Sequence, residues 1–212
     1  MGTISTRQVA GLSLVVGPIV AVVCYFIQLF GVSPDIWTDP ASVAAALAGG
    51  GALTVLTSIV IPIGIGGLVF GIFFIADGIV GNGNGDALAR YSKLLILIGF
   101  AGFVYGSGTQ VLVANYPEAT SAVYTGWAIS GVSGVFFSLG FLAIFLAMAS
   151  RAEYNAALAN AAAGVAVVAV VCSIIGTASK DLNQVMTLVV WITYLIHTIY
   201  AIYLGRTLCR AQ

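Results

Sequence analysis

Six long runs of apolar residues alternate with short polar segments along the chain. The runs are Val9–Phe30, Ala52–Ala76, Leu94–Ala114, Val123–Ala149, Ala156–Thr177 and Val185–Gly205. Each can form one membrane-spanning helix, because a hydrocarbon core about 30 Å thick needs roughly 20 apolar helical residues. Strands of a membrane barrel would alternate apolar and polar positions, whereas these runs are continuous. The pattern therefore predicts an all-α integral membrane protein, a bundle of six transmembrane helices that forms one domain over residues 1–212.

The longest connection, between the first and second runs, contains its own helix signals. Asp39-Pro40 is typical of a helix start, the alanine-rich stretch Ala41–Ala48 follows it, and three glycines end it. We expect a short helix at the outer membrane interface, with the nearby Trp37 at the level of the lipid headgroups. If residues 41–80 instead form a hairpin around Pro62, the chain crosses the membrane seven times.

The composition excludes a water-soluble domain. Apolar residues make up 60% of the chain and charged residues only 7%, and the mean hydropathy is +1.10. A soluble domain carries about 25% charged residues. Seven basic and seven acidic residues cancel, which leaves no basic surface for nucleic acid. The predicted partner is therefore the lipid bilayer.

The basic residues predict how the bundle is oriented. Six of the seven fall on one side of the predicted membrane: Arg7, Arg90, Lys93, Arg151, Arg206 and Arg210. Only Lys180 falls on the other side. Since basic loops are retained in the cytoplasm, we expect both termini to be cytoplasmic and the protein to lie in the cytoplasmic (inner) membrane.

Small residues recur at the spacing of one helical face. Because lipid is as apolar as leucine, membrane helices associate through close packing, which small residues permit. The candidate packing residues are Gly126, Ser130, Gly134 and Ser138 in the fourth run, Gly102 and Gly106 in the third, and Gly67 and Gly71 in the second. The fourth run is accordingly expected at the centre of the bundle. With 26 glycines in the chain, chance is the alternative explanation of these spacings.

One ionisable residue lies near the middle of a predicted span. An ionisable group at this depth usually marks a functional site. The chain's single histidine, His197, shares a helical face with Tyr194 and Tyr200, and the three form a candidate polar site. The alternative is a histidine hydrogen-bonded between packed helices. No carboxylate cluster or second histidine accompanies it in the sequence, so we expect no metal and no cofactor.

The segment Gly131-Val132-Ser133-Gly134 in the fourth run resembles the Gly-x-Ser-Gly motif of rhomboid intramembrane proteases. In that family a histidine on the sixth helix activates the serine, which implies Ser133 as nucleophile and His197 as base. Counted from the outer edges of their spans, the two residues differ in depth by only ~3 Å. The second rhomboid helix supplies a histidine and an asparagine to the oxyanion site, whereas this chain has Pro62, Gly67 and Gly71 there.

Three functions are compatible with these features. The leading hypothesis is a small non-catalytic membrane protein, a subunit or accessory of a larger assembly that packs against other subunits or against itself. A channel or transporter for a neutral or apolar solute is the second, with span 2 broken near Pro62. The third is a rhomboid-like serine hydrolase that uses Ser133 and His197. An enzymatic role is the less favoured interpretation.

Overall fold

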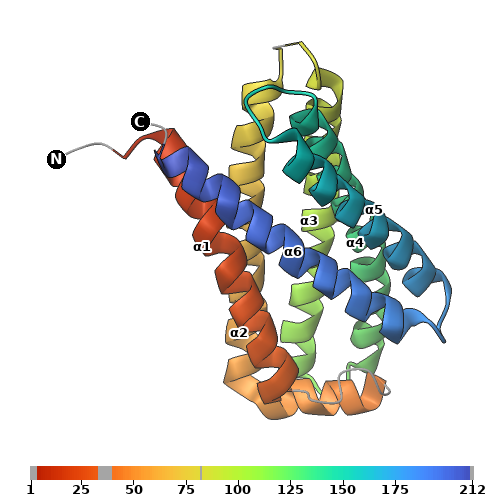
Figure 1. The fold of residues 1–212 in the computed structure, drawn as a ribbon. Coiled ribbons are helices and arrows are strands. Elements are labelled where there is room, and N and C mark those ends of the chain that lie inside the picture. The colour runs from red at the N-terminus through yellow and green to blue at the C-terminus, as the bar shows by residue number, and fades with distance from the viewer. Residues whose placement is uncertain (1–3, 33–39, 82, 211–212) are drawn as a thin grey trace.

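A computed structural model describes residues 4–32, 40–81 and 83–210, and six long α-helices make up nearly all of this part of the chain (Figure 1). The helices are α1 (Thr6–Ile27), which continues into the π-helical turn η1 (Gln28–Val32), α2 (Pro40–Ile79), α3 (Asp86–Asn115), α4 (Thr120–Ala149), α5 (Ala156–Ala178) and α6 (Asn183–Arg210). All six are long and apolar enough to cross a membrane, as predicted.

The helices extend beyond the apolar runs that predicted them. Helix α3 begins at Asp86 rather than at Leu94, so its first two turns are polar. Arg90 pairs with Asp86 one turn earlier, at 3.1 Å, and such i,i+4 pairs stabilise exposed helix ends. A hydropathy pattern detects only the part of a helix that is apolar, which explains why the prediction began late.

The predicted short helix and the predicted second span join into α2. Only Gly51 departs from helical geometry inside it (φ 46°, ψ −120°), a conformation that favours glycine. Figure 1 shows the segment before Gly51 lying across one end of the bundle. Its place at the membrane surface remains a prediction, and Trp37 and Asp39 lie outside the described residues.

Pro62 lies inside the helical part of α2 without ending it. The alternative seven-span hairpin around Pro62 is therefore wrong, and so is the expected break of span 2 at this proline. A proline removes one backbone hydrogen bond, but neighbouring helices and side chains make this loss tolerable in a membrane helix. The observed break lies at Gly51 instead.

The six helices form a closed ring in chain order. Each helix packs against the next one along the chain, and α6 packs against α1 to close the ring. Helix α4 also reaches α2, and it is the most buried of the six. This agrees with the central position that its small residues predicted.

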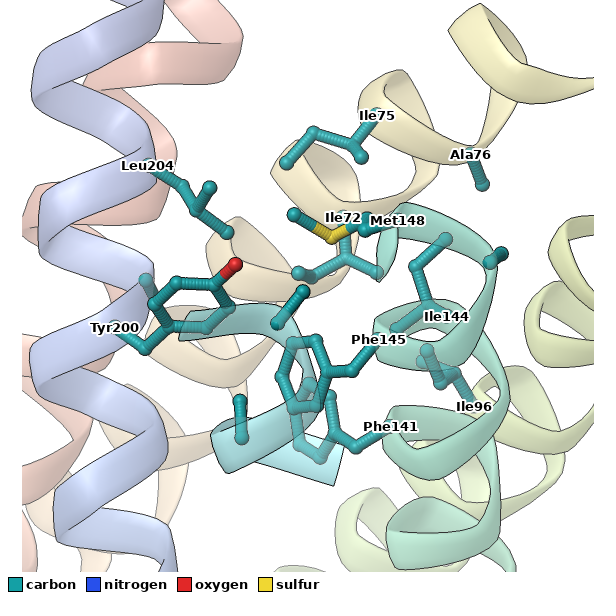
Figure 2. Packing of buried hydrophobic residues seen from close by; sticks show 14 of the residues in the cluster. Ile72, Ile75, Ala76, Ile96, Phe141, Ile144, Phe145, Met148, Tyr200 and Leu204 are labelled. Atoms are coloured by element: carbon teal, nitrogen blue, oxygen red, sulfur yellow. The ribbon is translucent and has the colours of Figure 1, made fainter. Parts of the chain in front are cut away.

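Large apolar side chains fill the interior of the ring (Figure 2). Phe141 and Phe145 of α4 stack with ring centroids 5.5 Å apart, and both are almost completely buried. Ile72 of α2 and Leu204 of α6 reach the same cluster. Side chains from α2, α4 and α6 therefore occupy the middle of the bundle.

Candidate functional site

The small residues of α3 and α4 face each other. A Cβ atom added to Gly106 would lie 2.7 Å from the hydroxyl oxygen of Ser130. A Cβ at Gly126 would meet the Thr109 side chain, and one at Gly102 would meet the Ser133 side chain of α4. A larger residue at these glycines therefore requires the facing hydroxyl side chain to rotate or the two helices to move apart.

The remaining candidate packing residues also contact helices of the same chain. Gly134 and Ser138 lie near Tyr194 of α6, whereas Gly67 and Gly71 of α2 face α1. The small residues of α4 therefore face α3 near the start of the helix, and α5 and α6 further along. This follows from geometry, since residues four apart are rotated by about 40° in an α-helix.

The structure does not join Ser133 to His197. The Ser133 hydroxyl donates to the Ile129 carbonyl of its own helix at 2.6 Å, and its side chain lies against Gly102 of α3. His197 uses Nε2 to contact the Ala162 carbonyl of α5 at 3.2 Å. A serine hydrolase needs a hydrogen bond between nucleophile and base, and these two side chains do not form one.

His197 lies in an aromatic pocket between α4 and α6. Its ring centroid is 5.2 Å from those of both Phe141 and Phe145, and only 4% of the residue is exposed. Because a carbonyl only accepts, the contact with Ala162 requires the proton on Nε2. Nδ1 is then a buried acceptor, and no side chain or backbone group of the described residues donates to it.

The two tyrosines predicted beside His197 make different contacts. The Tyr194 ring lies 6.4 Å from that of His197, and its hydroxyl is 3.1 Å from the Ser138 hydroxyl. The Tyr200 ring packs instead against Phe145 and Tyr203. Of the expected polar trio, the structure thus pairs Tyr194 with His197 and places Tyr200 among apolar and aromatic neighbours.

A second polar cluster joins three helices near the end of the bundle that carries η1. Gln28 donates from Nε2 to the Ser58 hydroxyl at 2.9 Å and to Oε1 of Gln110 at 3.2 Å. Ser58 in turn donates to the same Gln110 oxygen at 2.9 Å. Gln28 is 3% exposed and Ser58 1% exposed, whereas Gln110 is half-buried, so the cluster is buried at α1 and α2 and reaches towards the surface at α3.

Two backbone irregularities lie beside this cluster. The π-helical turn η1 begins at Gln28, and π-turns occur mostly as isolated features, frequently at functional sites. Pro62, four residues after Ser58, has no N–H to donate to the Ser58 carbonyl. Both irregularities place polar backbone groups near the side chains of the cluster.

The Gln28–Ser58–Gln110 cluster could not be predicted from ionisable residues inside the spans, because its three side chains are uncharged. A search for uncharged amides inside apolar runs would have found Gln28 and Gln110. The amides carry no charge and are not bases at neutral pH, and the Ser58 hydroxyl bonds to these amides rather than to a base that could activate it, so this site recognises or joins groups through hydrogen bonds.

Within the described ranges, no three His, Cys, Asp or Glu side chains gather at a place that could hold a metal ion. Cys24, Cys172 and Cys209 are all free thiols on different helices. No protein-family model, curated protein or solved structure matches the chain.

Proposed function

We propose that this protein is a small non-catalytic subunit or accessory of a larger assembly in the cytoplasmic membrane, with both termini in the cytoplasm. The six apolar helices are compatible with a polytopic membrane protein. Many large apolar side chains point outward from them, among them Leu56, Ile63 and Ile199, each more than half exposed. Lipid or other membrane helices must cover such a surface.

The inside of the bundle favours a structural role. Phe145, Ile72 and Leu204 occupy the middle of the ring, where a solute pathway would have to pass. The polar groups of the Gln28–Ser58–Gln110 cluster bond to one another rather than pointing at a cavity. These contacts hold helices together, which is what interhelical hydrogen bonds do in other membrane bundles.

The observation that carries the proposal is an uncovered small-residue face on α5. Ala157, Ala161 and Gly164 are exposed and lie on one side of the helix, with the larger exposed Val168 next to them. A Cβ atom at Gly164 would have no heavy atom within 4 Å. The opposite side of α5 is also small, with buried alanines packed against its neighbours in the ring. Helix α5 can therefore receive another membrane helix at close range.

The test is the substitution Gly164→Leu, with Gly108→Leu as the matched control. Gly108 of α3 is also exposed, and a Cβ there would likewise have no neighbour within 4 Å. It lies between the large exposed residues Tyr105 and Leu112, so no small face surrounds it. The mass of the complex extracted from native membranes in mild detergent is measured by native mass spectrometry.

We expect the wild type and Gly108→Leu to emerge in a complex heavier than the 21.7 kDa chain. Gly164→Leu should emerge as the single chain, because leucine holds the partner helix away from α5. A wild type that is strictly monomeric in the mildest detergent contradicts the proposed function. If both variants retain the complex, α5 is not the contact face.

A further inference from the structure

A shallow groove runs along the outer face of α6, at the end of the bundle where both termini lie (Figure 1). The hydrogen bond from Arg7 to the Leu208 carbonyl, at 3.2 Å, holds the two chain ends together there. The groove is lined by Ile199, Ile202, Tyr203, Arg206, Thr207 and Arg210. The lower half of the groove, from Ile199 to Tyr203, is apolar and aromatic. The upper half, from Arg206 to Arg210, carries two cations.

Among the described residues, no acidic side chain pairs with the two cations of the groove, Arg206 and Arg210. Three other cations at the same end of the bundle form ion pairs with carboxylates. These pairs are Lys93 with Asp77 at 2.6 Å, Arg90 with Asp86 at 3.1 Å, and Arg151 with Glu153 at 2.8 Å. The hydrogen bond from Arg151 lowers the pKa of Glu153 and keeps this carboxylate charged. In the described part of the chain, Arg206 and Arg210 make no ion pair.

The spacing of these arginines is unfavourable without a bound anion. Arg206 and Arg210 are exposed and lie one turn apart on the same face, and like charges at i,i+4 repel each other. One phosphate group between them would turn this repulsion into attraction, since guanidinium groups bind phosphate oxygens in a bidentate manner.

The lower half of the groove fits a hydrocarbon chain. Ile199 is 68% exposed and Tyr203 45% exposed, and both lie on the side of Arg206 that faces the middle of the helix. From Ile199 to Arg210 the helix rises by about 16 Å. An elongated ligand with a charged head and an apolar tail matches this change from apolar to cationic lining.

We propose that this α6 groove binds one anionic phospholipid of the cytoplasmic leaflet. The phosphate lies between Arg206 and Arg210, and an acyl chain runs over Ile199 and Ile202. The inference rests on the membrane placement in the proposed function, but it does not depend on α5 or on any protein partner.

The test compares dioleoyl phosphatidylglycerol with dioleoyl phosphatidylcholine, which have the same acyl chains but differ in net charge. The full chain is placed in nanodiscs that contain equimolar amounts of both lipids. The protein is then released from the nanodisc in the mass spectrometer, and the lipids that remain bound to it are identified by native mass spectrometry. The variant is Arg206→Gln with Arg210→Gln. The matched control is Arg90→Gln with Lys93→Gln, which removes the same charge from the same end of the bundle.

We expect the wild type and the control to retain one phosphatidylglycerol molecule. The Arg206/Arg210 variant should retain it roughly thirty-fold more weakly, because each arginine near an anionic lipid surface contributes about 1 kcal/mol. Equal retention of the two lipids by the wild type overturns the proposal. So does equal loss from variant and control, or full displacement of the lipid by inorganic phosphate.

The result of the lipid-retention test is independent of the result of the test for a larger complex. Lipid retention is measured on the isolated chain, so a monomeric protein that keeps phosphatidylglycerol supports the groove while contradicting the subunit hypothesis. Conversely, a stable complex that Gly164→Leu disrupts supports the subunit hypothesis even when the α6 groove shows no preference between lipids.

Discussion

Each polar side chain inside the bundle needs a hydrogen-bond partner within the protein, since the lipid tails provide none. Hydroxyl groups find it in their own helix: Ser133 donates to Ile129, Ser92 to Ala89 and Thr193 to Val190, each to the carbonyl of the preceding turn. Glutamine amides have both donors and an acceptor, and Gln28 donates from Nε2 to Ser58 and Gln110 on other helices. Many hydroxyls are therefore satisfied within their own helix, whereas the Gln28 amide and the hydroxyls of Ser58 and Ser138 link helices.

The amide link predicts a measurable coupling between Gln28 and Gln110. Each single substitution, Gln28→Leu or Gln110→Leu, should lower the free energy of unfolding by about 1–3 kcal/mol, because it leaves buried polar partners unsatisfied. The double variant should lose less than the sum, with a coupling energy of about 1 kcal/mol. Unfolding titrations with SDS in mixed micelles measure all three values.

Thr57 provides the control for this cycle. Its hydroxyl is buried in the same region of α2, but it donates only to the Leu53 and Thr54 carbonyls. The pair Gln28→Leu and Thr57→Val should therefore be additive. A coupling energy for Gln28 and Gln110 no larger than the one for this pair means that the amides do not join α1 to α3.

Neither the relative depth of residues on different helices nor the rotation of each helix could be predicted from the sequence. Counting residues predicted Ser133 and His197 at similar depth, whereas the His197 ring packs against Phe141 and Phe145, about two to three turns further along α4 than Ser133. One residue also turns a side chain by about 100°, so Gly134 faces Ser173 of α5 and Tyr194 of α6 while the adjacent Ser133 faces α3. Which face is inward depends on the packing of all six helices, and the short motif around Ser133 does not contain that information.

At the scale of the helix, the contact between α1 and α2 depends on glycines that let the two backbones touch. A Cβ atom at Gly64 would lie 2.6 Å from the Gly17 carbonyl oxygen and 2.8 Å from the Ala21 nitrogen. These are backbone atoms, so they cannot rotate away as a side chain can. Pro18 and Pro62 lie one or two residues from this contact and leave backbone carbonyls without their helical partners.

We expect Gly64→Ala to destabilise the protein by about 1–3 kcal/mol, because overpacking must push α1 away from α2. Gly66→Ala is the matched control two residues along the same helix. A Cβ there would meet only the Phe100 ring at 3.4 Å, and alanine favours helix over glycine. The same unfolding titration compares them, and equal stability of the two variants would show that the α1–α2 backbone contact is unimportant.

The six helices could be predicted well, because in a long apolar run a membrane helix satisfies the backbone hydrogen bonds that lipid cannot. The positions at which a helix is interrupted could not be predicted. Pro62 suggested an interruption, but α2 passes through it, whereas Gly51 at the end of a glycine run takes the one non-helical conformation in α2. The helix tolerates a missing hydrogen bond more readily than the sequence pattern suggests, and only glycine offers a positive φ at low cost.

At the scale of the whole molecule, charge separates the two ends of the bundle. The loop with Arg151, the start of α1 and the last turns of α6 lie at one end of the bundle. Lys180, which follows α5, lies at the other end. Helix α4, with 30 residues, joins the two ends and is long enough to cross a bilayer. Two exposed residues flank it, Glu118 before and Ala152 after.

These two positions test the predicted orientation. Glu118→Cys and Ala152→Cys are made separately in a chain whose Cys24, Cys172 and Cys209 are changed to serine. A membrane-impermeant maleimide should label Glu118→Cys on intact cells, because basic segments are retained inside and the end with Glu118 then faces out. Ala152→Cys should react only after the cells are permeabilised. The reverse pattern would place the arginine-rich end outside and remove the basis for a cytoplasmic-leaflet lipid in the α6 groove, while labelling of both positions on intact cells would contradict α4 as a membrane span.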